Sequence, residues 1–177
     1  ISRTTVSQVT LQALRAQVQR PAVQELLLRA VQDAPLGELR AEALQYVAKL
    51  RPGEATALAK VLLREPSPHL LAGAIRTLGM TAAADSAEAL CALADAAESE
   101  VRAAVAAALG SLSHLCIEPT LRKLTADSET YVRLLAAASY VRTPERDLAI
   151  VRRILRDPTP RVRTHAAQAL AERAGTQ

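Results

Sequence analysis

The sequence has almost no aromatic residues: it contains no Trp, no Phe and three Tyr among 177 residues. Bases of single-stranded nucleic acids usually stack on aromatic side chains, so this composition disfavours a base-stacking platform. Glycine occurs six times, which is too few for the many tight turns of a β-sandwich or barrel. The sequence also lacks an apolar run of about 20 residues, the length that a membrane-spanning helix needs.

Residues that commonly carry chemistry are also scarce. Cys91 and Cys116 form no CxxC pair and no disulfide framework, so we predict that both are buried as small apolar residues. His69, His114 and His165 have no His, Cys or carboxylate at a metal-ligand spacing. Phosphate-binding glycine motifs, HExxH and GxSxG do not occur. The sequence therefore predicts no catalytic residue, no metal and no cofactor.

Alanine and leucine dominate what is present, with 37 Ala and 27 Leu. Both are strong helix formers, whereas the β-branched and aromatic residues typical of sheets are few. The composition therefore predicts an all-α fold, and the length suffices for one domain or a short array of repeats.

One sequence pattern recurs along the chain. An aliphatic residue, usually followed by Arg and then by small residues, begins each of five copies at spacings of 30 or 31 residues, with a weaker copy before them. A fixed period of this length is the signature of a repeat architecture. The anchors of the copies are Val9, Leu39, Leu70, Val101, Val132 and Val162.

Each strong copy also contains the signals of two helices. An acidic residue, often followed by Pro or Ser, precedes each anchor by five or six positions, as expected where one helix stops and the next begins. Apolar residues on both sides follow the helical period, which predicts pairs of antiparallel helices of about ten to thirteen residues and about eleven helices in total. The acidic residues are Asp33, Glu65, Asp95, Asp127 and Asp157.

The pattern Asp-x-x-x-x-Val-Arg-x-x-Ala-Ala-x-Ala-Leu, best seen at residues 95–109 and 157–170, resembles the HEAT repeat. In particular, it is similar to the short bacterial form found in phycobilin lyase subunits, and the resemblance covers residues 7–173. It implies an α-solenoid, a right-handed superhelix of five to six helix-pair repeats, as one domain over residues 1–177. The copy at Leu70 departs from the pattern, with Leu71 in the Arg position and Gly73 inside the helix.

The chain begins at Ile1 without Met, which predicts that it is part of a longer chain. A leader, an anchor or a neighbouring domain could precede it, so the compartment cannot be read from the sequence, although the cytoplasm is favoured.

Stacked helix pairs must share a continuous apolar spine, because one pair cannot bury its apolar stripe alone. Alignment of the second helices places two rows in this spine, four and eight residues after each anchor. The first row is Ala43, Ala74, Val105, Ala136 and Ala166, and the second is Val47, Leu78, Leu109, Tyr140 and Leu170.

The acidic and Arg rows have two interpretations. They could form a charge track for an anionic ligand, but the regular spacing favours a structural ladder in which each carboxylate caps a helix or accepts from the Arg of the next anchor. The predicted ladder residues are Asp95, Arg102, Asp127, Arg133, Asp157 and Arg163, with Arg40 in the same row.

Curved helical arrays usually bind partners on the concave face, which the second helices line. Positions three, six and ten residues after the anchors should be exposed there, small and apolar at the centre and polar at the ends. We predict a shallow groove for an apolar helix or extended peptide, although the small residues could instead only permit tight curvature. The predicted groove residues are Gln45, Arg76, Ala104, Ala107, Leu135, Ala138 and Arg142.

Positive charge is concentrated near the C-terminal end. Residues 142–163 hold seven Arg against three carboxylates and account for the whole formal charge of +4. This segment could bind an acidic protein segment, a phosphate backbone or a membrane surface, or it could be a solvated helix face. The predicted patch is Arg146, Arg152, Arg153 and Arg156.

These observations favour a non-catalytic protein-interaction module or scaffold that binds a partner helix or peptide. A nucleic-acid-associated protein or a HEAT-like DNA glycosylase is the first alternative. Those glycosylases bind DNA along a basic concave face and use aromatic residues beside a catalytic carboxylate, whereas here the aromatics are Tyr46, Tyr131 and Tyr140, with no Trp, and the basic excess lies at one end. An accessory subunit of a modifying enzyme, as in the lyases, is the second alternative. No oligomeric state is predicted.

Overall fold

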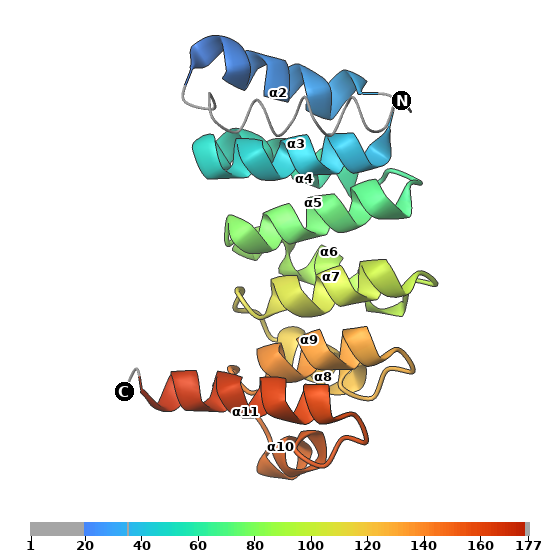
Figure 1. The fold of residues 1–177 in the computed structure, drawn as a ribbon, viewed down its shortest axis with the longest axis vertical. Helices are drawn as coiled ribbons and strands as arrows, with labels where there is room; N and C mark the ends of the chain where they lie inside the picture. The colour runs from blue at the N-terminus through green and yellow to red at the C-terminus, as the bar shows by residue number, and fades with distance from the viewer. Residues whose placement is uncertain (1–19, 35, 176–177) are drawn as a thin grey trace. The chain divides into compact units, whose positions relative to one another are not determined.

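A computed structural model describes residues 20–34 and 36–175 of the chain (Figure 1). Within these residues it contains ten α-helices, two short 3₁₀ helices and no strand, which confirms the all-helical prediction. The weak copy at Val9 lies outside the described residues. The chain forms two compact units, residues 1–77 and 78–177, and the division falls near the end of α5.

The first unit is built from long helices. They are α2 (Pro21–Asp33), α3 (Gly37–Leu50), α4 (Pro52–Leu62) and most of α5 (Pro68–Met80). Helix α3 packs against both α2 and α4. Gly73, which departs from the repeat pattern, lies where a Cβ would come within 2.5 Å of the Ala41 Cβ, so only glycine allows this approach of α5 to α3.

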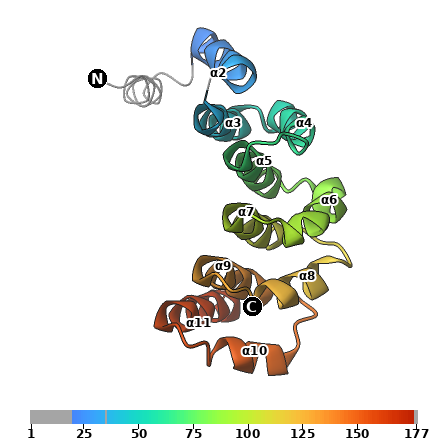
Figure 2. The same cartoon turned by 90° about the vertical axis from the view of Figure 1, so that its right-hand side faces the viewer.

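The second unit has its helices in two layers, which Figure 2 shows end on. Helix α9 packs between α7 and α11 in one layer, and α8 lies against α9 from the other. The first layer is α7 (Ser99–Leu109), α9 (Thr130–Tyr140) and α11 (Pro160–Ala174). The other layer is α6 (Ala87–Ala92), α8 (Ile117–Leu124) and α10 (Leu148–Ile154), with the 3₁₀ helices η1 (Ala84–Ser86) and η2 (Leu93–Asp95) flanking α6.

The first helices of this unit are shorter than the sequence predicts, at six, eight and seven residues. Two local causes are visible. Helix α6 tightens into η2 at Leu93, and α10 starts only at Leu148, where the Asp147 carboxylate caps the Ala149 N–H at 2.7 Å.

The predicted spine is confirmed. All five residues of the row four positions after the anchors have no exposed side-chain surface. In the second row Val47, Leu78, Leu109 and Tyr140 are buried, and Leu170 is half-buried near the chain end.

Tyr140 is a large aromatic member of this spine, and its hydroxyl has polar partners. The hydroxyl donates to Glu118 Oε1 at 2.7 Å and accepts from the Asp147 N–H at 3.0 Å. Burial, aided by the Glu118 carboxylate, raises the pKa of Tyr140. The phenol therefore links α9 to the start of α8 and to the loop that leads into α10.

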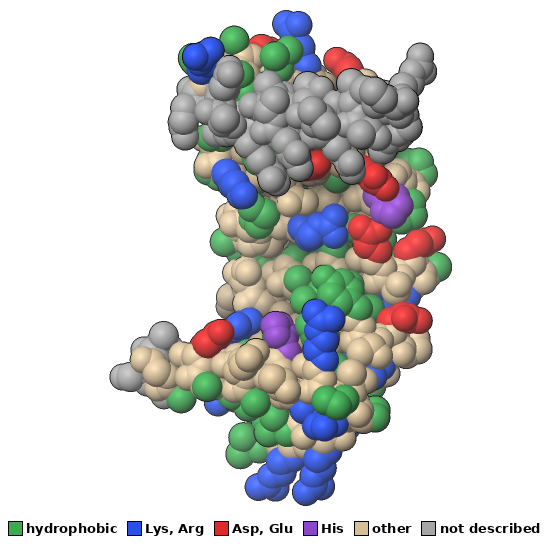
Figure 3. Space-filling view, in the orientation of Figure 1, with side chains coloured by type: hydrophobic (Ala, Val, Ile, Leu, Met, Phe, Trp, Pro, Cys, Tyr) green, Lys and Arg blue, Asp and Glu red, His purple; other side chains and the backbone are tan. Residues whose placement is uncertain are grey.

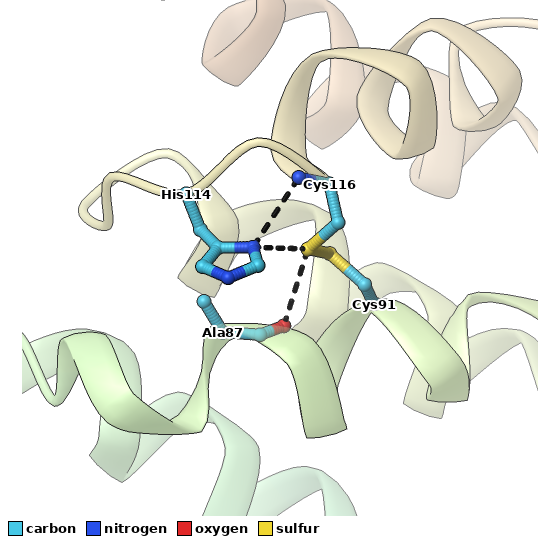
Figure 4. Close-up of a disulfide and its surroundings, with 4 residues drawn as sticks. All are labelled: Ala87, Cys91, His114 and Cys116. Carbon is cyan, nitrogen blue, oxygen red and sulfur yellow. Dashed lines mark hydrogen bonds between the residues drawn. A yellow bond between two sulfur atoms is a disulfide. The ribbon is translucent and has the colours of Figure 1, made fainter.

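The prediction for the cysteines is wrong, because Cys91 and Cys116 form a disulfide (Figure 4). Cys91 lies on α6, and Cys116 lies immediately before α8, which packs next to α6. The loop from 110 to 116 brings the two Cα atoms to 6.4 Å, although their separation of 25 residues differs from the repeat period. His114 Nδ1 lies 3.2 Å from the Cys116 Sγ, on the exposed side of this bond.

Candidate functional site

Arginine side chains in the first turns of second helices connect successive repeats of the second unit. Arg102 binds Asp127 through two nearly parallel contacts, Nε to Oδ2 at 2.7 Å and Nη2 to Oδ1 at 3.0 Å. Its Nη1 donates to the Ala96 and Ala97 carbonyls of its own turn, at 2.9 and 2.8 Å. Each guanidinium nitrogen of Arg102 is therefore used inside the fold.

The same arrangement recurs one repeat later. Arg133 Nε and Nη2 reach the Asp157 carboxylate at 2.9 and 3.4 Å, while Nη1 donates to the Asp127 and Ser128 carbonyls. Each carboxylate thus accepts from the Arg of the preceding repeat. The prediction that it accepts from the Arg of the next anchor is therefore wrong. The reason is that Nη1 of the next Arg, Arg133, donates to the backbone carbonyl of Asp127. Its Nε and Nη2 therefore point toward the following repeat, where they reach Asp157.

Asp95 departs from this arrangement. Its side chain pairs with Lys123 of α8. In the first unit, Arg40 donates to the Val31 carbonyl at 2.8 Å and to Glu65 at 3.3 Å. Asp95 therefore forms an exposed ion pair, whereas the Asp127 and Asp157 side chains are largely buried in their pairs with Arg102 and Arg133.

The pKa values of the two ladder carboxylates, Asp127 and Asp157, are lowered. Hydrogen bonds from Arg102 lower the pKa of Asp127 against the opposing effect of burial, helped by the Glu129 N–H. Burial raises the pKa of Asp157, but hydrogen bonds from Arg133 and from the Thr159 N–H outweigh it, and the net shift is downward. Both side chains are 8% exposed.

A lowered pKa in the folded state makes stability depend on pH. The contribution of Asp127 and Asp157 is complete above the unfolded pKa of about 3.9, and it is lost as the pH falls through the lower folded pKa. We expect urea unfolding to show that Asp127→Asn/Asp157→Asn is less stable than wild type at pH 7, by about 2 kcal/mol or more. The difference should shrink below pH 4, and a constant difference down to pH 2 would contradict the pairing.

The second helices also form the surface where the sequence predicts a groove. Ala107 on α7 is exposed and Leu135 on α9 is half-buried. Ala104 and Ala138 are 3% and 5% exposed, so the prediction that they line an open surface is wrong. Close packing of α9 against its neighbours covers these two methyl groups.

Tyr131 is the residue on this surface that the sequence analysis missed. Its side chain is 61% exposed, and it lies one turn before Leu135 on the same face of α9. Hydrophobic side chains gather over the middle of α7 and α9 in Figure 3, with basic side chains beside them. The signal in the sequence that could have indicated Tyr131 is an aromatic residue directly before the anchor Val132.

The polar ends of the predicted groove belong to different units. Gln45 on α3 and Arg76 on α5 are half-buried in the first unit. Arg142 follows α9 in the second unit, and its Nη2 pairs with Glu172 of α11 at 2.7 Å. Arg142 also borders a hollow of about 370 Å³ between the loops after α7 and α9, which Leu115 and Glu118 line as well.

The structure divides the predicted basic patch. Arg146 donates to the Thr143 carbonyl at 3.2 Å, and Arg153 donates to Thr125 Oγ1 at 2.6 Å, so both stabilise the fold. Arg152 and Arg156 are exposed on α10 and at its C-terminal end, without a partner among residues 20–34 and 36–175.

The described part of the chain contains no group of three or more His, Cys, Asp or Glu placed to hold a metal ion. None of its helices combines the length and the apolar character that crossing a membrane requires.

Comparison with known families finds one match. A model of HEAT repeats matches residues 23–110 and again residues 55–138. The match concerns HEAT repeats in general and not the lyase-type form. A search of curated proteins finds no match.

Proposed function

Since the chain belongs to the HEAT-repeat family, whose members are commonly protein-interaction scaffolds, we propose that it binds a partner helix or extended peptide through the second helices α7 and α9. The single observation that carries this proposal is the exposed Tyr131 with the half-buried Leu135 one turn later on α9, together with the exposed Ala107 on the neighbouring helix α7. We call these three residues the α7–α9 surface.

The composition of this surface suits a helical or extended partner segment. Tyr131 offers a large rigid contact area with a polar tip, which is typical of residues that dominate binding energy. The small side chain of Ala107 leaves room for a partner backbone to approach α7. Leu135 extends the apolar strip by one turn, in the spacing that helix-in-groove recognition uses.

The buried residues beneath support the same proposal. Ala104 and Ala138 pack the helices tightly, so they hold the exposed residues on a rigid base rather than contacting a partner. The ladder pairs Arg102–Asp127 and Arg133–Asp157 fix the same helices at their first turns. Such a preformed surface loses little conformational entropy when it binds.

The experiment is a selection of peptides from a phage-displayed library of random 16-residue sequences on the immobilised chain. We expect enriched peptides whose affinity, measured by fluorescence anisotropy, falls about tenfold or more in Tyr131→Ala and in Ala107→Glu. Both side chains lie at the surface, so neither change should disturb the fold.

Val61→Ala is the matched control, because Val61 is 71% exposed on α4, in the other unit. Its affinity should equal that of the wild type. Peptides that bind equally well to Tyr131→Ala, or a library that yields no binder, would contradict the proposal.

A further inference from the structure

The two sulfur atoms of the Cys91–Cys116 disulfide have different surroundings (Figure 4). His114 Nδ1 lies 3.2 Å from the Cys116 Sγ and also accepts from the Cys116 N–H at 3.3 Å. The Ala87 carbonyl oxygen lies farther from this sulfur, at 3.7 Å, so the imidazole is its nearest polar neighbour. In the described part of the chain, no hydrogen bond is made to the Cys91 sulfur.

The ends of two helices add to this difference. Cys116 is the N-cap residue of α8, where the free N–H groups of the first turn favour a negative charge. Cys91 lies in the last turn of α6, where the backbone carbonyls have the opposite effect. The helix and a proton on His114 therefore both stabilise a thiolate at Cys116, and neither stabilises one at Cys91.

The disulfide lies close to solvent. Both cysteines are half-buried, His114 is exposed, and the Leu115 side chain beside them is 87% exposed. Residues 112–115 also line the hollow of about 370 Å³ between the loops after α7 and α9. Partial exposure next to a histidine is typical of reactive cysteines, whereas structural cysteines are usually buried and inert.

We propose that the Cys91–Cys116 bond is a thiol–disulfide exchange site for a dithiol reductant, in which Cys91 is the attacked sulfur and Cys116 is the leaving group. A thiolate of the dithiol attacks the Cys91 Sγ and forms a mixed disulfide with it. The S–S bond of the protein breaks, and its electron pair goes to the Cys116 Sγ. This direction is favoured because the sulfur that is more stable as a thiolate leaves faster.

The second thiol of the reductant completes the reaction. Its thiolate attacks the reductant's own sulfur in the mixed disulfide, and Cys91 leaves as a thiolate and is protonated. In total the dithiol loses two electrons and two protons and becomes a disulfide. Cys91 takes one of these protons, and the pair of Cys116 and His114 takes the other. The loop at 110–116 is then no longer tied to α6.

The rate of reduction by dithiothreitol at pH 7 tests the role of His114. Free thiols are counted over time by coupling them to a maleimide that carries a polymer, which shifts the labelled chain on a gel. We expect His114→Ala to lower the second-order rate constant about tenfold, because the leaving thiolate loses its partner. His165→Ala is the matched control, since His165 is an exposed histidine on α11 of the same unit, and it should react like the wild type.

The monothiol glutathione tests which sulfur is attacked. It forms a mixed disulfide with one cysteine of the wild-type chain, and iodoacetamide added at early times alkylates the cysteine that has left. Mass spectrometry of the peptides then assigns both positions. We expect glutathione on Cys91 and the alkyl group on Cys116. This measurement uses the wild-type chain, so no variant needs to fold.

Three results would overturn the proposal. His114→Ala could be reduced as fast as the wild type, or glutathione could be found mainly on Cys116. The third result is a bond that dithiothreitol opens only when urea unfolds the chain, because such a disulfide would be purely structural.

Discussion

Leu109→Asp should unfold the second unit. Leu109 is fully buried in the spine on α7, so the substitution removes apolar contacts and buries a carboxylate among apolar side chains. Such changes cost more than about 4 kcal/mol, a large share of the stability of a domain. Circular dichroism at 222 nm during heating measures the effect as a lost or much lower transition.

Leu115→Asp is the matched control for this prediction. Leu115 is 87% exposed in the loop after α7, so the same change of side chain there should leave the melting temperature nearly unchanged. If Leu109→Asp melted like the wild type, the register of the spine derived from the repeat would be wrong.

Reduction of the disulfide should have the second largest effect. The bond joins α6 to the start of α8 and closes a loop of 25 residues, which constrains the unfolded chain. The chain-entropy model gives a stabilisation of about 3 kcal/mol for a loop of this size. We expect urea unfolding with a phosphine reductant to show a loss of this order.

The variant Cys91→Ala/Cys116→Ala separates the disulfide from other effects of the reductant. Its stability should match that of the reduced wild type and should not respond to reductant. Thiol titration of the unfolded, unreduced wild type should find no free thiol. Two free thiols, together with unfolding that ignores reductant, would contradict the bond.

The fold could be predicted because it is encoded by a repeated local pattern. Each anchor and the residues four and eight positions later are apolar in all five strong copies, so the period alone predicts that Ala43 and Leu109 are buried. Helix ends were less predictable. In α6, the change to a 3₁₀ turn at Leu93 depends on packing that the period does not record.

The candidate site was only partly predictable, because exposure depends on how closely two helices pack. Ala104 and Ala107 differ by less than one turn, yet the first is buried and the second exposed. Tyr131 was overlooked because it precedes an anchor and therefore lies outside the rows considered. The disulfide was missed because its spacing of 25 residues follows loop geometry and not the repeat period.

The direction of the ladder could not be predicted from the sequence. The spacing places an Arg both before and after Asp127 and Asp157, and only the structure shows that these two carboxylates accept from the Arg of the preceding repeat. Asp95 instead pairs with Lys123.

Hydrogen–deuterium exchange on the chain, with and without a peptide selected on it, tests the central claim most directly. Binding at the α7–α9 surface predicts slower exchange in residues 99–109 and 130–140, and no change in residues 52–62 of α4. Protection confined to the loops at 110–116 and 141–147, or to α10, would place the peptide elsewhere and contradict the account.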